Sequence, residues 1–190
     1  EDGATLLAHL EKIVQYNVQS SEKEKFDGVM LDIEPYISDS WKENPEEYMD
    51  RYISCMKKGY KFAQKNHLRT AICIPRHYDN QGLTSGLEEL IKETCDEVAV
   101  MNYSCGNEIE AIRTEAALSE KYGKELHCIL EFQEVGKHGL TENKTYRNKG
   151  IDNAKETWEK LQKEYKNINV TRDYHWSRPV REMLEEKNAD

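Results

Sequence analysis

The chain has 190 residues, of which 37% are hydrophobic and 33% charged, and its formal net charge at pH 7 is −9. This length fits one ordinary domain with a substantial core. The acidity argues against a nucleic-acid or anionic-membrane partner because no basic block offsets it, and no apolar run is long enough for membrane insertion. Five scattered cysteines without a CxxC pair argue against a zinc site or a disulfide framework, so no metal or other cofactor is expected.

Hydrophobic periodicity predicts helices and strands in regular alternation. Residues 4–19 form the first expected helix, and the expected strands are 26–34, 69–75, 97–103, 125–132 and 169–176. Between them we expect helices at about 45–66, 85–94, 107–123 and 150–166, with a last helix beginning at Ser177. Three of these helices begin at capping-box patterns, at 44–47, 85–88 and 107–110.

Strands that alternate with helices imply βαβ crossovers and a parallel sheet. Two architectures fit, an open doubly wound sheet and a TIM-type (β/α)8 barrel. No glycine-rich phosphate loop follows a strand, which weakens the nucleotide-binding doubly wound version. Polar and aromatic residues instead stand at the ends of successive strands, as in a barrel active site: Asp32, Glu34, Arg76, His77, Tyr103, Glu131, Gln133 and Trp176. Because a whole barrel needs about 250 residues, we expect residues 1–190 to form a single barrel domain that lacks its first three strands.

The stretch FDGVMLDIEPY, residues 26–36, carries two acids inside an apolar run. Strand alternation places Met30, Asp32 and Glu34 on one face, with the two acids about 6.5 to 7 Å apart along the backbone. Two carboxyl groups held there away from bulk water cannot both ionise at low cost, so one would stay protonated and could act as an acid. The alternative is that both acids are structural and bond backbone amides or an arginine.

Residues 27–34, DGVMLDIE, resemble the fourth-strand motif D-G-x-D-x-D-x-E of family 18 glycoside hydrolases, the chitinase group. Asp27, Asp32 and Glu34 match this pattern, while Met30 stands in place of the middle acid. Further along, Met101-Asn102-Tyr103 resembles the sixth-strand motif M-x-Y-D, with Ser104 in place of the aspartate. Trp176 stands where the family has the tryptophan that floors its sugar site. The chain is most similar to uncharacterised bacterial relatives of the chitinases, and under this resemblance its strands are the fourth to the eighth.

The resemblance implies a retaining, substrate-assisted glycosidase that acts on β-linked glycans containing N-acetylglucosamine. Glu34 would be the general acid, Asp32 would orient the substrate's 2-acetamido group, and Tyr103 would hydrogen-bond near that group. Trp176 would stack on the sugar, and the other expected substrate-binding residues are Glu131, Gln133, Met30, Met101 and His77. Since a thioether cannot share a proton, Met30 puts activity in question. The resemblance favours a secreted or cell-surface protein, whereas the odd number of cysteines, which leaves at least one free or paired between chains, argues weakly against it.

Two alternatives stay open. Glu131, at the end of its strand, could be the nucleophile of a retaining glycosidase in which Glu34 is the acid/base, if the two carboxyl groups are about 5 to 5.5 Å apart. Against this, Ile33 precedes Glu34 where that class has asparagine, and a substrate-binding or structural role for Glu131 is equally in keeping with its position. The other alternative is a catalytically silent carbohydrate-binding barrel, which Met30 and Ser104 favour and the presence of Glu34 opposes.

Overall fold

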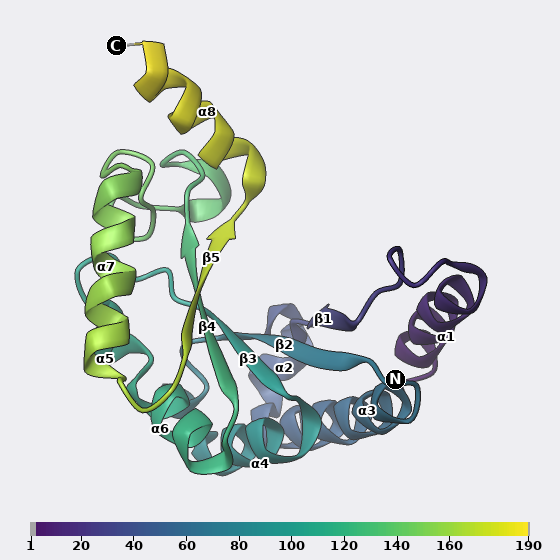
Figure 1. Cartoon of the computed structure of the whole chain (residues 1–190). Helices are drawn as coiled ribbons and strands as arrows, with labels where there is room; N and C mark the ends of the chain where they lie inside the picture. Colours follow the sequence, from purple (N-terminus) through teal and green to yellow (C-terminus); the bar gives the residue numbers. More distant parts are fainter. Residues whose placement is uncertain (1–2, 190) are drawn as a thin grey trace. The chain divides into compact units, whose positions relative to one another are not determined.

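The computed structural model describes residues 3–189, with side chains to residue 186. It has a mixed α/β fold with one all-parallel sheet of five strands and flanking helices (Figure 1). The strands are β1 (Gly28–Asp32), β2 (Arg69–Pro75), β3 (Glu97–Met101), β4 (Glu125–Glu131) and β5 (Val170–His175), and they lie in the sheet in the same order as in the chain. The predicted α/β class and parallel sheet are confirmed.

The helices occupy the connections that the periodicity predicts, with small additions. The α-helices are α1 (Ala4–Gln19), α2 (Asp39–Glu43), α3 (Pro45–Lys65), α4 (Thr84–Thr94), α5 (Glu108–Ala111), α6 (Arg113–Tyr122), α7 (Ile151–Glu164) and α8 (Ser177–Ala189). Short 3-10 helices are η1 (Pro35–Ile37), η2 (Asp79–Gln81) and η3 (Lys137–Gly139). The chain divides into two compact units, Glu1–Ile74 with Tyr78–Val98 and Pro75–His77 with Ala99–Asp190, which we call the first and the second unit.

In the first unit, α3 is the central helix, with α4 beside it and α1 packed on it (Figure 1). Its buried residues recur at helical spacing, so that one stripe faces the core: Met49, Tyr52, Ile53, Met56, Gly59 and Ala63. The close approach of α1 depends on Gly59, because a Cβ atom there would lie 2.6 Å from Leu6 Cδ2. A larger residue at this position would force the Leu6 side chain to shift.

The two strands of the β1–β2 ladder differ in burial. Ile72 and Ile74 of β2 are fully buried on one face. On the other face Met30 is 51% exposed and Asp32 is also exposed, but their register partners in β2, Ala71 and Cys73, are buried. After Arg69, β2 is therefore buried on both faces, and the accessible part of the ladder is the end of β1 that carries Met30 and Asp32.

The β4–β5 ladder in the second unit is divided in the same way. Leu126, Cys128 and Leu130 are fully buried on one face. Apart from the buried Ile129, the alternate residues of both strands are polar and lie half-buried or buried on the other face: Glu125, His127, Glu131, Thr171, Asp173 and His175. Trp158 of α7 packs on the apolar face, stacked on Phe132 and edge-on to Tyr174, and its indole N–H donates to the Cys128 carbonyl oxygen at 2.9 Å.

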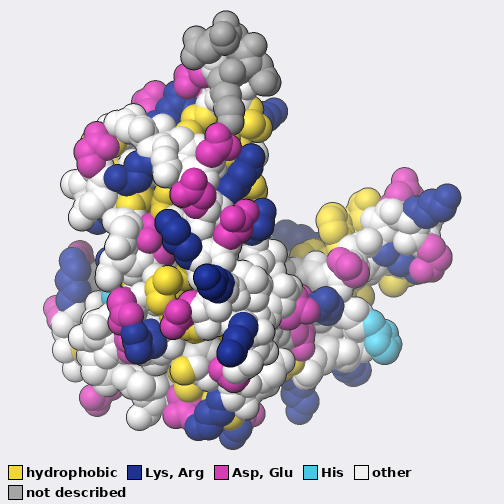
Figure 2. All heavy atoms as spheres, turned by 60° about the vertical axis from the view of Figure 1, so that its left-hand side comes forward, with side chains coloured by type: hydrophobic (Ala, Val, Ile, Leu, Met, Phe, Trp, Pro, Cys, Tyr) yellow, Lys and Arg dark blue, Asp and Glu magenta, His cyan; other side chains and the backbone are white. Residues whose placement is uncertain are grey.

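The outer face of α7 is charged, as its sequence predicts. Ile151, Ala154, Trp158 and Leu161 form its buried stripe, while its lysine and glutamate side chains are mostly exposed. On the face of the molecule drawn in Figure 2, basic side chains (Lys, Arg) and acidic side chains (Asp, Glu) are interspersed. This mixture differs from the single-sign patch that a nucleic-acid surface would carry.

The predicted capping boxes are wrong. Asn44 and Asn107 do precede helices, but neither makes a side-chain capping bond, and Leu83 rather than Ser85 precedes α4. The helix expected at 107–123 is interrupted at Ile112, which is fully buried with a non-helical backbone. Its predicted end is confirmed, since Gly123 adopts φ 62°.

The described residues bear on two further expectations, the state of the cysteines and the presence of a membrane-spanning helix. All five cysteines lie among them and none forms a disulfide; Cys73 and Cys128 are buried, as their apolar surroundings predict. Within residues 3–189, no helix combines the length and the hydropathy of a bilayer-spanning segment.

Candidate functional site

The predicted site residues fall into two sets, and the first set lies where β1 ends in the first unit. Asp32 is the last residue of β1 and is exposed, and Glu34 follows two residues later, half-buried, at the start of η1. Met30 and Asp32 are exposed while Val29 and Leu31 are half-buried, which agrees with the predicted alternation. The phenol of Tyr36 donates a hydrogen bond to Oε1 of Glu34.

Tyr36 is a residue that the sequence analysis missed. Burial, and next the hydrogen bond to Glu34, raise the pKa of Tyr36 well above its usual value. The Tyr36 hydroxyl group therefore stays protonated at physiological pH and remains a hydrogen-bond donor to the carboxyl group of Glu34. The sequence does contain a sign of this contact. Tyr36 has a hydroxyl group and stands two residues after Glu34, and Pro35 between them fixes the turn.

Two buried aromatic side chains hold Tyr36 in place. The ring of Tyr36 lies edge-on to that of Tyr78, with centroids 6.1 Å apart, and Tyr78 also contacts the ring of Trp41 at 5.6 Å. Tyr78 is fully buried and Trp41 is 3% exposed. The position of the Glu34 partner is thus set by packing within the first unit, as a preorganised site requires.

The second set surrounds Glu131, the last residue of β4 in the second unit. Glu131 is 2% exposed, and its Oε1 accepts hydrogen bonds from the backbone N–H groups of Phe132 and Gln133, both at 2.8 Å. Its Oε2 lies 2.7 Å from Nδ1 of His175 and 3.4 Å from the side-chain nitrogen of Gln133. Glu131 and His175 are register partners in the β4–β5 ladder, so their side chains lie on one face.

These hydrogen bonds keep Glu131 ionised. Burial raises the pKa of Glu131, but the hydrogen bonds from His175 and from the amides of Gln133 and Phe132 outweigh burial, and the net pKa lies below the usual value. An ionised carboxylate can only accept hydrogen bonds, so the proton between the two side chains is on Nδ1 of His175. Glu131 therefore acts as a fixed anion that orients an imidazole ring.

Three predicted residues lie around this pair. The ring of Tyr103, which follows β3, lies 5.8 Å from that of His175. Trp176 follows β5 directly through a cis peptide bond and is 47% exposed. Gln133 and Trp176 line one cavity of about 130 Å³ together with charged side chains: Glu134, Lys137, Arg147, Arg178 and Glu182. The structure thus brings Glu131, Gln133, Tyr103 and Trp176 into one neighbourhood.

The two remaining predicted residues of the second unit lie at strand ends. Met101 is the last residue of β3 and is half-buried, and His77 lies half-buried in the turn after β2. Ser104, which replaces the aspartate of the resembled motif, is half-buried, and its N–H donates to the Asn102 carbonyl oxygen. Asn102 is 1% exposed and donates to the Glu108 carbonyl oxygen at 2.9 Å, which anchors the loop after β3.

A larger open cavity of about 850 Å³ lies between residues 105–110, which include most of α5, the loop 146–149 and α7, all within the second unit. Glu108, 7% exposed, forms part of its wall and accepts hydrogen bonds from the Gly106 N–H and the Tyr146 hydroxyl. Tyr146 in turn lies 2.8 Å from the Thr157 hydroxyl of α7. This network connects two loops to a helix, and we assign it a structural role.

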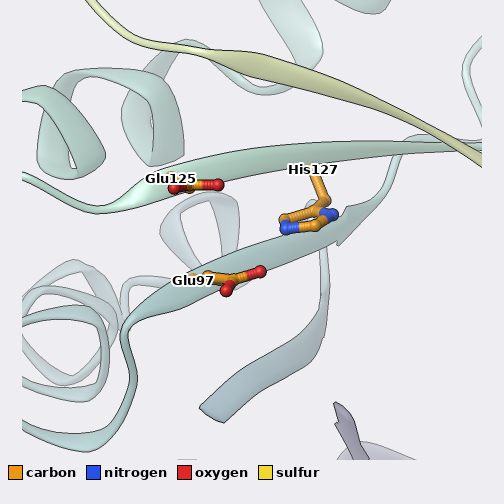
Figure 3. Close-up of side chains that lie close together, drawn as sticks. All are labelled: Glu97, Glu125 and His127. Carbon is orange, nitrogen blue, oxygen red and sulfur yellow. The ribbon is translucent and has the colours of Figure 1, made fainter. Parts of the chain in front are cut away.

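Side chains of metal-ligating type occur at the start of two strands. Figure 3 shows Glu97 at the beginning of β3 and Glu125 and His127 near the beginning of β4. Glu97 forms an ion pair with Arg69 at 2.6 Å in the first unit, and His127 Nδ1 lies 2.9 Å from Asp173 in the second. Because Glu97 and His127 already contact the charged side chains of Arg69 and Asp173, we assign no metal to these residues.

We compared the chain with protein-family models, with curated protein sequences and with solved structures, and none of the three comparisons found a match.

Proposed function

We propose that the chain is a glycan-active protein of β/α-barrel type, related in mechanism to the family 18 glycoside hydrolases that its first strand resembles. The strand order supports a barrel over a doubly wound sheet, because a doubly wound sheet reverses its order at a switch point whereas these strands run β1-β2-β3-β4-β5. The burial of β2 and β3 on both faces is also in keeping with a barrel, whose strands are covered by helices outside and by packed side chains inside.

The group around Glu34 carries the proposed chemistry. Glu34 lies two residues after the end of β1 and is half-buried; Tyr36 bonds its carboxyl group, and Asp32 is the last residue of the strand. Protonated Glu34 would transfer its proton to the glycosidic oxygen while the bond to the sugar breaks, and water would later return a proton to the carboxylate. Tyr36 remains a donor throughout and holds the carboxyl group in place.

The remaining roles follow from the same scheme. Asp32 would orient the substrate's 2-acetamido group, which attacks the anomeric carbon in place of an enzyme nucleophile. In the second unit, the exposed face of Trp176 would bind the apolar face of a sugar ring. Tyr103 and Gln133 would bind polar groups of the same sugar beside it, and Met30, Met101 and His77 stay predicted contacts.

Glu131 fits a positioning role better than that of a nucleophile. Both of its oxygens accept hydrogen bonds, and it is 2% exposed. A nucleophilic carboxylate oxygen must reach the anomeric carbon, and doing so here would break the bond to His175. We therefore propose that Glu131 positions the sugar-binding residues and does not itself react with the sugar.

A catalytically silent, carbohydrate-binding protein is the second candidate. The exposure of Asp32 and Met30 favours it, because an acid pair in contact with water lacks the shielding that keeps one member protonated. The exposed ring of Trp176 would bind sugar in an enzyme and in a silent binding protein alike, so it does not distinguish the two candidates.

The two candidates separate in one experiment. The parent chain, Glu34→Gln and the control Glu46→Gln, an exposed acid in the first turn of α3, are incubated with chitin oligomers and with peptidoglycan fragments. We measure released reducing ends and, separately, sugar affinity. The enzyme proposal predicts cleavage by the parent and the control and a loss of about 100-fold or more in Glu34→Gln. Equal sugar binding by all three without cleavage would support the silent protein, and no binding by any of them would refute both.

A further inference from the structure

Two pairs of histidine and carboxylate connect β4 and β5 on their polar face. His175 Nδ1 lies 2.7 Å from Glu131, and His127 Nδ1 lies 2.9 Å from Asp173. The first pair is directly opposite in the ladder, and the second is diagonal, since His127 is opposite Thr171. The pairs are chemically alike, so their surroundings distinguish their roles.

The pairs differ in exposure and in position along the strands. The side chain of His175 is 45% exposed above a carboxylate that is 2% exposed, whereas the side chain of His127 is 12% exposed. His175 is the last residue of β5, beside Tyr103 and next to Trp176, while His127 lies near the start of β4. Ligands of parallel α/β folds bind at the C-terminal ends of the strands, which is where the exposed pair lies.

The exposed pair is held in a fixed geometry. The Glu131 carboxylate is fixed by two backbone N–H groups, and the imidazole of His175 is oriented by the carboxylate in turn. Gln133 connects the pair to the cavity at Trp176, because its amide group contacts Glu131 and its side chain lines that cavity. A polar group ordered before binding loses little entropy when a ligand arrives.

We propose that His175, positioned by Glu131, hydrogen-bonds a hydroxyl group of the sugar ring that lies on Trp176. This inference rests on the proposed function and deepens it, since it adds a specificity-determining pair to the sugar site. The imidazole can accept from a hydroxyl group or, when protonated, donate to it. The adjoining indole suits the apolar face of the ring, so the ligand class is a pyranose with a free hydroxyl group at its edge.

The test uses asparagine substitutions at both histidines. His175→Asn keeps a nitrogen donor near the position of Nδ1 and so keeps the partner of Glu131, but removes the outer part of the ring. The matched control is His127→Asn in the second pair. Affinity for a chitin trimer is measured by tryptophan fluorescence, to which Trp176 is the exposed contributor because Trp41 and Trp158 are 3% and 1% exposed.

We expect His175→Asn to weaken the trimer affinity by about 3- to 10-fold, the effect of one hydrogen bond, and His127→Asn to leave it unchanged. Glu131→Gln should weaken it as well and should also alter the imidazole tautomer of His175 seen by nitrogen NMR, which would link the loss of affinity to the orientation of the ring. If the parent binds the trimer and His175→Asn binds it equally well, this inference is wrong while the proposed function stands. If the parent binds no sugar, both are wrong.

Discussion

Replacing Glu131 with glutamine should destabilise the protein at pH 7 by about 1.5 to 3 kcal/mol, the usual worth of a hydrogen bond to a charged group. Glutamine keeps one oxygen to accept from the amides of Phe132 and Gln133, so those two bonds survive. It loses the acceptor for His175. The larger cost of about 3 to 5 kcal/mol for breaking a buried ion pair does not apply, because His175 is 45% exposed and stays hydrated after its partner is gone.

The destabilisation should depend on pH with a definite sign. The pKa of Glu131 in the folded protein lies below its ordinary value, despite burial, because of the bonds from His175 and two amides. Such a group stabilises the fold above its unfolded pKa, about 4.3, and this contribution is lost as the pH falls through the folded-state pKa. The difference between parent and Glu131→Gln should therefore be largest near pH 7 and shrink below about pH 4.

Urea unfolding at several pH values measures this difference, followed by the fluorescence of Trp158, which is buried in the same unit. Glu134→Gln is the control, because Glu134 is exposed and pairs with Lys137 at the surface, so its loss should change stability little. Equal stability of parent and Glu131→Gln at pH 7, or a difference that does not shrink as the pH falls below about 4, would refute the assignment of Glu131 as a buried anion.

Two further substitutions test the packing that positions the site. Gly28→Ala places a Cβ atom 2.8 Å from the Arg69 carbonyl oxygen, so β1 and β2 must separate. We expect a net loss of stability of about 1 to 2 kcal/mol, since overpacking exceeds the gain from removing a glycine. An unchanged melting temperature would contradict this expectation. Trp158→Phe removes the donor to the Cys128 carbonyl oxygen and part of a buried ring; it should cost about 1 to 3 kcal/mol in urea unfolding, and a more stable variant would contradict the packing described for α7.

The positions of the elements were predictable from apolar periodicity, because burial of a face is decided over many residues. The first helix, expected at 4–19, is Ala4–Gln19, and the strand expected at 69–75 is Arg69–Pro75. Helix starts were predicted less well. A cap is one hydrogen bond, and packing outweighs it: Leu83 and Leu87 are buried at the start of α4, which fixes that start irrespective of Ser85.

The break at Ile112 has a similar cause. The sequence 107–123 reads as one helix because its propensities are continuous. In the structure Glu108 is buried and bonded to Gly106 and Tyr146, and Ile112 is fully buried. Tyr146 is 38 residues away from Glu108 in the chain. No local pattern contains that contact, so the short α5 could not be read from the sequence.

Strand alternation predicted which residues share a face but not what they touch. It placed Asp32 with Met30 and Glu131 with Ile129. It could not supply Tyr36 as the partner of Glu34, because Tyr36 lies beyond the strand in a 3-10 turn. It also could not supply His175 for Glu131, because the two residues are 44 positions apart and local alternation does not determine the register of their strands.

The polar face of β4 and β5 is the feature that a purely structural account explains least well. On β4 the apolar face alone supplies a core, since Leu126, Cys128 and Leu130 are fully buried there. Burying a carboxylate such as Glu131 costs free energy that hydrogen bonds only offset, and aliphatic side chains at such positions are often as stable or more so. The cost is localised at the C-terminal end, where the histidine partner is exposed beside an exposed tryptophan. A ligand that uses both side chains gives this arrangement a physical reason, and the two asparagine variants measure whether it exists.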